Sequence, residues 1–332
     1  MRDVTTPKRK PTRRAAVVYN PLKVDILTLE TVVAAAAKEA GWHRTLWFET
    51  TVDDAGQLLV AQAIEQGATM VMAAGGDGTV RAVAEGLRGT GVPMALLPSG
   101  TGNLLARNLD IHFTNLAETV AVAFGGVDRE IDLGLASIVR ENGQSEDHVF
   151  LVMAGLGLDA KMIKKTNTKL KKAVGWLAYV DAIGRSLPEI KPVKLRVSID
   201  GETARAVNVH TIIIGNCGRL PGGILLIPDA RPDDGVLDFV ALRPRGPFGW
   251  VKVWNKLAWE NGVLRKSAVG RRIIDLSRDV KDVTYRTGKD LRMTVETPQE
   301  FQLDGDEFGE AKSVHTWVDP GALTVRVPAG SF

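Results

Sequence analysis

The 332-residue sequence contains a single cysteine, Cys217, and lacks any apolar run long enough to cross a membrane. One cysteine excludes an internal disulfide bond and any metal site built from paired cysteines. The longest apolar stretches, such as 70–74 and 211–215, fall far below the roughly 18 residues that a membrane-spanning helix needs. The basic N-terminus is not followed by the apolar region of a secretory signal. These absences predict a cytoplasmic protein.

Several common catalytic and nucleotide-binding motifs are also missing. None of the five histidines has the HExxH spacing of a metal site, so we expect each of them to be structural. The GxxxxGK[ST] loop of P-loop enzymes does not occur, and no GxGxxG follows the first predicted strand, which disfavours a Rossmann dehydrogenase. The net charge is only +3, and we expect no nucleic-acid partner.

The order of apolar and turn-forming segments predicts two folded domains behind a basic, disordered tail at residues 1–14. Residues 15–132 alternate between strand and helix patterns, which predicts a doubly wound, mostly parallel α/β sheet. Residues 133–332 contain short β-rich runs between Gly, Pro and Asp turns, which predicts an antiparallel sandwich whose final strand returns to the first domain. The predicted strands of the first domain are 15–20, 43–50, 69–75 and 93–98, and its helices are 29–41, 55–67, 79–87 and 103–109.

Two glycine-rich turns, 75–79 and 98–103, each follow a predicted strand and precede a predicted helix. Because neighbouring parallel strands end at the same edge of a sheet, we expect these turns to lie side by side. Backbone N–H groups in such turns and the positive end of the following helix favour phosphate. With no P-loop lysine, the acidic Asp77 is consistent with Mg²⁺ held between a carboxylate and phosphates. The alternative is a pair of tight turns in which Asp77 caps the helix.

Taken together, these motifs resemble the soluble bacterial diacylglycerol kinase family, whose catalytic domain is shared with sphingosine and ceramide kinases. The resemblance extends from about residue 15 to residue 328, and GGDGTVR at 75–81 is its most specific motif. PSGTGN at 98–103 matches the family's GTxN loop, and Asn20-Pro21 resembles its first nucleotide loop, although Lys23-Val24 replaces the family's Ser-Gly. The resemblance implies these nucleotide-binding residues: Asn20, Pro21, Thr50, Gly75, Gly76, Asp77, Gly78, Thr79, Gly100, Thr101 and Asn103.

The resemblance also implies two acidic features around the β-rich half. Asp132, in the IDLG segment at 131–134, corresponds to a residue that faces the active cleft. The segment 228–238 corresponds to a structural Mg²⁺ site made by the Asp234 carboxylate and the backbone carbonyls of Arg231 and Val236. A tight Asp-Gly turn can place carbonyl oxygens around a hard cation. On its own, however, the DDG sequence is more typical of a hairpin turn.

The segment LDGDEFGE at 303–310 resembles the family's Leu-Asp-Gly-Glu, in which the glutamate is the general base. Here Asp306 takes that place and Glu307 follows it. In an extended segment Asp304 and Asp306 would share one face and Glu307 would point away. We therefore assign the base to Asp306, with Asp304 and Asp77 as further catalytic carboxylates and Glu307 as the alternative base. An acidic hairpin tip without catalytic function is the other interpretation.

The implied activity is ATP-dependent phosphorylation of a lipid hydroxyl, with diacylglycerol as the preferred acceptor and phosphatidic acid as the product. Mg²⁺ would lie near Asp77, with Asp132 or Asp304 as further ligands. A sphingosine-type or undecaprenol-type lipid kinase stays open, as does an NAD kinase-like or phosphofructokinase-like kinase acting on a sugar hydroxyl. A protein that binds nucleotide or lipid but has lost catalysis is the non-enzymatic alternative.

A lipid acceptor requires access to a membrane surface. The lysine-rich segment 161–172, the apolar segment 174–184 and the basic tail could rest on anionic lipid headgroups. We therefore expect peripheral association with the inner face of the membrane, and the resemblance also allows a homodimer. A solvated helix face explains the lysines equally well. Some tryptophans could anchor at the membrane interface, although packing is the simpler role for most: Trp176, Trp250, Trp254 and Trp259.

Overall fold

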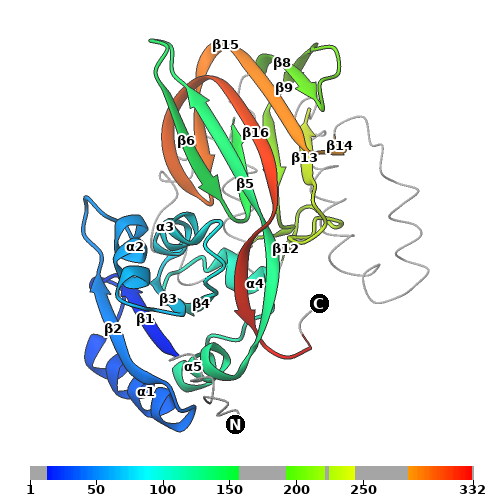
Figure 1. Cartoon of the computed structure of the whole chain (residues 1–332). Helices are drawn as coiled ribbons and strands as arrows, with labels where there is room; N and C mark the ends of the chain where they lie inside the picture. The colour runs from blue at the N-terminus through cyan, green and yellow to red at the C-terminus, as the bar shows by residue number, and fades with distance from the viewer. Residues whose placement is uncertain (1–12, 157–191, 221–223, 244–282, 331–332) are drawn as a thin grey trace, which may run out of the picture. The chain divides into compact units, whose positions relative to one another are not determined.

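The computed structural model describes residues 13–156, 192–220, 224–243 and 283–330 (Figure 1). The predicted helices at 168–186 and 248–259, the lysine-rich segment and its four candidate anchor tryptophans lie outside the described residues, as does nearly all of the predicted tail. The chain divides into two compact units. One unit contains residues up to Gly100, His112–Arg129 and Thr324 onward, and the other contains Thr101–Ile111 and Glu130–Leu323. The sequence predicted a single boundary at residue 132. In the structure, Thr101–Ile111 belongs to the second unit and the residues from Thr324 onward belong to the first.

A parallel sheet forms the centre of the first unit, in the strand order β4-β3-β1-β2 (Figure 1). The strands consist largely of buried apolar residues, as expected for a sheet covered on both faces. Arg14 already belongs to the first strand and pairs with His43, so the predicted tail extends too far. The strands are β1 (Arg14–Tyr19), β2 (His43–Glu49), β3 (Met70–Gly75) and β4 (Met94–Pro98).

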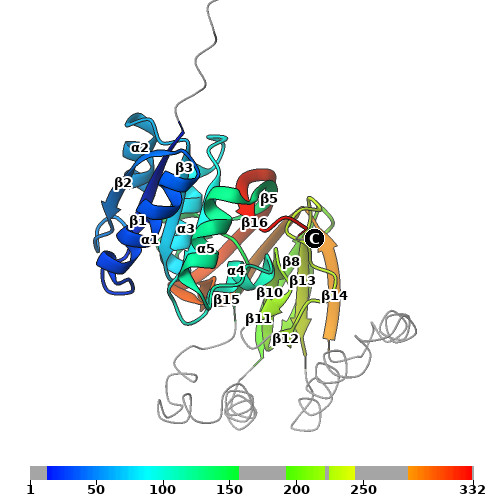
Figure 2. The ribbon, with the colours of Figure 1, turned by 90° about the horizontal axis from the view of Figure 1, so that it is seen from below.

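Helices cover both faces of this sheet (Figures 1 and 2). Apolar residues of α1 and α5 pack on one face, in a cluster that includes Val33 and Val120. On the other face α2 contacts α3, and the Gly56 backbone before α2 lies close to Val83 of α3 and Val18 of β1. These helices are α1 (Ile26–Glu39), α2 (Gln57–Glu65), α3 (Asp77–Leu87) and α5 (Leu116–Gly125). The doubly wound architecture is therefore confirmed.

Two helix boundaries differ from the predictions. Helix α3 begins at Asp77, two residues before the predicted start, because the first turn includes the second half of the glycine motif. Helix α5 has no predicted counterpart. Its N-cap, Asn115, accepts a hydrogen bond from the N–H of Ala117, and this capping residue was the available sequence signal.

The second unit is rich in antiparallel strands, as predicted. Its strands pair in the order β14-β13-β10-β7-β15-β16, with β5-β6 joined to β16 and β8-β9 joined to β15. A buried cluster including Phe150, Phe239 and Phe301 forms its core. Its elements are α4 (Leu104–Asn108), β5 (Val127–Val139), β6 (Ser145–Phe150), β7 (Met153–Leu156), β8 (Val193–Ile199), β9 (Arg205–Val209), β10 (Thr211–Gly215), β11 (Arg219–Leu220), β12 (Ile224–Leu225), β13 (Leu237–Leu242), β14 (Val283–Gly288), β15 (Asp290–Leu303) and β16 (Asp306–Val327).

The last strand connects the two units, as the sequence predicted. Most of β16 belongs to the β-rich unit, whereas its last residues belong to the first unit. There Val325 pairs in parallel with Met94 of β4. Within the described residues, no helix is both long enough and apolar enough to cross a membrane.

Candidate functional site

Several predicted nucleotide-binding residues gather at the carboxyl edge of the parallel sheet. The N–H of Asn20 donates to the carbonyl of Ala74 at 2.9 Å, which holds the turn after β1 against β3. The N–H of Ser99 donates to the carbonyl of Gly75 at 2.8 Å, which holds the turn after β4 against the same strand. Thr50, which is buried, follows β2 directly. This edge is where ligands bind in doubly wound sheets.

The turn between β3 and α3 leaves no room for a side chain at Gly75. A Cβ atom on Gly75 would lie 2.6 Å from Oγ1 of the buried Thr79. Gly76 is the N-cap of α3, and a Cβ atom there would lie 3.7 Å from the Cα of Gly100 in the neighbouring turn. Within the first unit the two glycine turns therefore approach each other, as predicted. Their glycines leave the backbone N–H groups accessible to a ligand that approaches closely.

Asp77 is the first residue of α3 rather than its cap. The cap position is occupied by Gly76, which has no side chain that could make a capping hydrogen bond. The interpretation of Asp77 as a helix cap is therefore wrong. A carboxylate in the first turn is stabilised by the positive end of the helix, which also attracts phosphate. The turn thus combines anion-binding amides with one carboxylate able to bind a cation.

The second glycine motif continues into the other unit, which contains Thr101 and Asn103. Thr101 is exposed, whereas Asn103 is buried and has a left-handed backbone with φ 47° just before α4. The Nε of Arg107 donates to the Gly102 carbonyl at 2.7 Å and fixes this loop from inside α4. The motif is therefore divided between the units after Gly100.

The Asp304-Gly305 dipeptide forms a two-residue hairpin turn between β15 and β16. Both residues have positive φ, 50° and 91°, as a type I′ turn requires, and Leu303 pairs with Asp306 across it. The Asp304 carboxylate accepts hydrogen bonds at 2.8–3.1 Å from three consecutive backbone N–H groups, those of residues 151–153. Asp304 is only 5% exposed. Asp304 therefore fixes the hairpin, and its role as a catalytic carboxylate stays a prediction.

Asp306 and Glu307 follow this turn and are both exposed. The extended segment that we expected at Asp304–Asp306 does not occur, because the chain reverses between the two residues. Asp304 and Asp306 consequently do not share a face. Asp306 begins β16, and Glu307 pairs with Gln302 of β15. Asp306 and Glu307, the two candidate general bases, thus lie directly after a hairpin turn that the buried Asp304 holds in place.

Asp132 is buried and connects three segments of the β-rich unit. Its two carboxylate oxygens accept from the N–H of Gly235 at 2.7 Å and the N–H of Gly321 at 2.8 Å. Its own N–H donates to the carbonyl of Pro232 at 2.6 Å. Asp132 therefore fixes the segment that contains the predicted structural metal site. With both oxygens hydrogen-bonded and only 3% of the residue exposed, the expected role as a magnesium ligand is not supported.

Sequence reasoning missed Asn216, which links these two acidic residues. Its Nδ2 donates to the carbonyls of Asp132 at 2.9 Å and Leu151 at 3.0 Å, and its N–H donates to the carbonyl of Val152 at 2.9 Å. The same 151–152 segment donates its amides to Asp304. A buried polar network thus connects the hairpin before Asp306 with the segment around Asp234. An asparagine directly after the apolar run 211–215 was the only available signal.

The predicted metal segment concentrates negative charge. Burial raises the pKa of Asp234, the hydrogen bond from the Val236 N–H opposes this, and the nearby negative charges of Asp132 and Asp233 raise the pKa further. A cation beside Asp234 would relieve that repulsion. Across the described ranges, no group of three or more His, Cys, Asp or Glu side chains is arranged to hold a metal. The predicted site needs only one carboxylate and two carbonyls.

Cys217 is buried, and its Sγ lies 3.6 Å from the carbonyl oxygen of Leu151. Burial raises the pKa of this thiol well above its usual range, and the negative charge of Asp304 adds to the effect. Both effects favour the protonated thiol over the nucleophilic thiolate.

Comparison with known proteins identifies the family. Residues 14–136 match the diacylglycerol kinase catalytic domain, and residues 152–327 match the YegS C-terminal NAD kinase beta sandwich-like domain. A Pseudomonas aeruginosa protein named "Probable lipid kinase YegS-like" is 33% identical over 305 residues, which cover 90% of this chain and 89% of that protein. The chain belongs to the bacterial diacylglycerol kinase family. The resemblance seen in the sequence is thus confirmed at the level of a lipid kinase family.

Other members of this kinase family are similar over most of their length. The Bacillus subtilis diacylglycerol kinase is 25% identical over 301 residues, covering 90% of this chain and 91% of that protein. The crystal structure of a Bacillus anthracis diacylglycerol kinase has a TM-score of 0.64 at 20% identity and covers 98% of this chain and all of that one. The similarity to the Bacillus anthracis structure shows that the two chains share a fold.

Proposed function

We propose that this chain is an ATP-dependent kinase that transfers the γ-phosphoryl group of ATP to a lipid hydroxyl, with diacylglycerol as the preferred acceptor. The glycine turn between β3 and α3 is the observation that supports this most strongly. It presents amides, a helix N-terminus and a carboxylate at the ligand-binding edge of a parallel sheet, in a chain from a lipid kinase family.

The nucleotide phosphates would bind the amides of residues 75–79 together with the adjacent turn at Gly100. Phosphoryl transfer depends on positioning and charge neutralisation more than on covalent chemistry, and this turn supplies both. Asn20, Pro21 and Thr50 would line the same edge. Thr101 and Asn103 stay further proposed nucleotide-binding residues.

Magnesium would neutralise developing charge on the phosphates when bound, and Asp77 is the residue that we propose to hold it. A carboxylate oxygen is a suitable ligand for this hard cation. A second, structural Mg²⁺ would be held by the Asp234 carboxylate with the carbonyls of Arg231 and Val236. The repulsion between Asp234 and its acidic neighbours supports this placement.

Asp306 is the proposed general base, which would take the proton from the acceptor hydroxyl. Its exposure at the start of β16 leaves it accessible to a substrate, and the buried Asp304 holds the hairpin in place. Glu307, the next residue, also has an exposed carboxylate and is the alternative base.

Steady-state kinetics of Asp306→Asn and Glu307→Gln test this assignment. We expect Asp306→Asn to lower kcat by about 100-fold or more, since general-base catalysis contributes roughly 10²–10⁴-fold. Glu307→Gln should retain kcat within a few-fold. The reverse pattern would transfer the role of base to Glu307.

A panel of acceptors tests the substrate. Purified protein is incubated with γ-labelled ATP, Mg²⁺ and one acceptor at a time, and the products are separated by thin-layer chromatography. Diacylglycerol should gain label fastest among diacylglycerol, a sphingoid base, undecaprenol and NAD. Faster labelling of NAD would show that the protein phosphorylates a sugar hydroxyl and is not a lipid kinase. Faster labelling of another lipid would replace diacylglycerol as the proposed acceptor and leave the lipid kinase activity unchanged.

We further propose peripheral binding to anionic membrane surfaces, because a kinase acting on diacylglycerol must reach its substrate in a bilayer. Basic residues near such a surface contribute about 1 kcal/mol each. Sedimentation with vesicles should show more bound protein when the vesicles contain anionic phosphatidylglycerol than when they contain only phosphatidylcholine. Equal partitioning would exclude an electrostatic contribution.

A further inference from the structure

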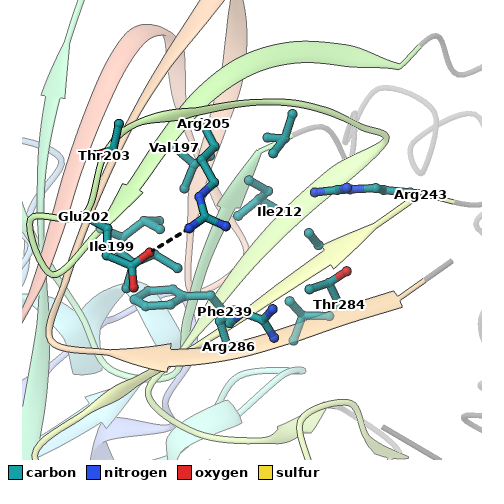
Figure 3. Close-up of a pocket in the computed structure, with 14 residues that line it drawn as sticks. Val197, Ile199, Glu202, Thr203, Arg205, Ile212, Phe239, Arg243, Thr284 and Arg286 are labelled. Atoms are coloured by element: carbon teal, nitrogen blue, oxygen red, sulfur yellow. Dashed lines mark ion pairs between the residues drawn. The ribbon is translucent and has the colours of Figure 1, made fainter. Parts of the chain in front are cut away.

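We propose that the β-rich unit contains a second ligand site, an arginine-rimmed pocket that binds a small amphiphile with a phosphate or carboxylate head and a short apolar tail. The pocket is formed by strands β8, β9, β10, β13, β14 and β15 (Figure 3). It shares no residue with the proposed nucleotide loops, the Asp306 hairpin or the metal segment.

The floor of the pocket is apolar. Phe239, Ile212 and Leu291 are nearly fully buried core residues, and Val197, Ile199 and Val207 pack beside them. The cavity volume is about 180 Å³. For comparison, a cavity of about 150 Å³ lined by aliphatic side chains accepts benzene, so this one can accept an alkyl segment of about six to eight carbons.

The rim of the pocket is strongly basic. Arg205, Arg243 and Arg286 line it, and among the described residues that line it the only carboxylate is that of Glu202 (Figure 3). A guanidinium nitrogen of Arg205 lies 3.7 Å from a carboxylate oxygen of Glu202, and the two side chains are 79% and 68% exposed. Such an exposed pair is weak and easily exchanged for another anion. The pocket therefore retains a clear excess of positive charge.

Arg243 supplies the observation that points to a ligand. Its Nε is buried, and no acceptor for this N–H is present among the residues that the structure describes. Burying a guanidinium N–H without an acceptor is unfavourable, and an oxyanion is the group that this planar donor recognises best. In Figure 3 the Arg243 side chain extends along the pocket wall from the end of β13, toward the side on which Ile212 lies.

The pocket and the proposed chemistry use different residues of the same sheet. Leu291, which lines the pocket, is near the start of β15, whereas Leu303 at the other end precedes the Asp304-Gly305 turn. Ile212, which also lines the pocket, pairs with Leu156 of β7, and Leu156 pairs with Phe301 near the hairpin end of β15. The rim arginines, not the residues proposed to act on the reacting hydroxyl, would hold the anionic head of this ligand.

Isothermal titration calorimetry of the full chain, without nucleotide, tests this site. Octyl phosphate combines the proposed head and tail, whereas inorganic phosphate lacks the tail and octanol lacks the head. We expect octyl phosphate to bind at least tenfold more tightly than either. Octanoate distinguishes the source of the anion: tighter binding than octyl phosphate indicates a fatty-acid carboxylate, and weaker binding indicates a phosphate monoester.

Variants locate the binding. Arg243→Gln and Arg286→Gln should each weaken octyl phosphate binding by about tenfold, the usual effect of losing a charge-assisted hydrogen bond. Arg292→Gln, an exposed arginine of β15 outside the pocket, is the matched control and should bind like the unmodified protein. Ala241→Phe should fill the cavity and abolish the advantage of octyl phosphate over inorganic phosphate. Unchanged affinity in both arginine variants, or no binding by the unmodified protein, would overturn the proposal.

Discussion

Asp304 illustrates how a residue in a catalytic-looking motif can have a structural role. Its carboxylate accepts hydrogen bonds from the three backbone amides of residues 151–153, which lead into β7, so the negative charge is compensated without solvent. The sequence correctly located the acidic hairpin. It could not distinguish the buried residue from the exposed one, because that difference depends on a segment about 150 residues away.

Asp304→Asn should therefore unfold more easily than Asp306→Asn. An amide in place of the carboxylate loses charge-assisted hydrogen bonds and places an NH₂ group against N–H donors, which should cost about 3 kcal/mol of unfolding free energy. Asp306→Asn, at an exposed position, should change it by less than about 0.5 kcal/mol. Urea unfolding of the two variants measures the difference, and equal stabilities would contradict the structural role of Asp304.

Cys217 should be unreactive in the folded protein. Because burial keeps its pKa raised, the thiolate that reacts with disulfide reagents is scarcely populated, and access is blocked as well. We expect no detectable reaction with Ellman's reagent over an hour in native buffer and one thiol per chain after denaturation. Rapid native labelling would mean that the region around the 151–153 segment opens readily.

Asp234 should make stability depend on pH. Its pKa is raised in the folded state, so its contribution to stability is complete below the ordinary aspartate pKa and is lost as pH rises through the folded-state value. Without metal, Asp234→Asn should match the unmodified protein at low pH and exceed its thermal stability at neutral pH. Thermal unfolding across this pH range measures the effect.

Magnesium should reverse this difference if the structural site is occupied. Mg²⁺ should raise the melting temperature of the unmodified protein at neutral pH but not that of Asp234→Asn. Asp77→Asn is the matched control, because it removes the other proposed magnesium carboxylate and should keep the stabilisation. Equal stabilisation of all three proteins would place the ion elsewhere.

The turn between β3 and α3 was the element best predicted from the sequence. Strand, glycines and helix are consecutive there, so local chain chemistry determines the geometry without distant contacts. The start of α3 was nevertheless placed two residues late, because glycines inside a first helical turn resemble a loop. The parallel strand pattern was equally clear, since short buried apolar runs alternate with helices.

Gly75→Ala should destabilise the protein through one specific contact. The new methyl group would lie 2.6 Å from Oγ1 of Thr79, which is itself buried, and such overpacking costs about 1–3 kcal/mol. Thr79→Gly should remove most of that penalty, because the Oγ1, Cβ and Cγ2 atoms of Thr79 all lie within 3.0 Å of the added methyl group, so the double variant should be less destabilised than the sum of the single ones. Gly125→Ala, where a methyl group meets open space, is the control.

Strictly additive effects in this double-mutant cycle would contradict the contact between Gly75 and Thr79. Measured by chemical denaturation, the cycle is independent of catalysis. A loss of nucleotide affinity in Gly75→Ala, with the fold retained, would further support binding at this turn.

For the molecule as a whole, the sequence predicted the two-part architecture and the return of the last strand, but not the network that joins the parts of the β-rich unit. Asn216 contacts the Asp132 and Leu151 carbonyls from the bend after β10, and no local pattern reports such contacts. The family explains the arrangement of motifs along nearly the whole chain. What remains to be measured is the reaction itself.

The most direct test follows the phosphoryl group from ATP to the lipid. Parallel reactions contain the purified protein, Mg²⁺, diacylglycerol and ATP labelled at either the γ or the α phosphate. The account predicts labelled phosphatidic acid from γ-labelled ATP and none from α-labelled ATP, with the signal lost in Asp306→Asn. A protein that binds ATP but leaves every lipid of the panel unlabelled would contradict it.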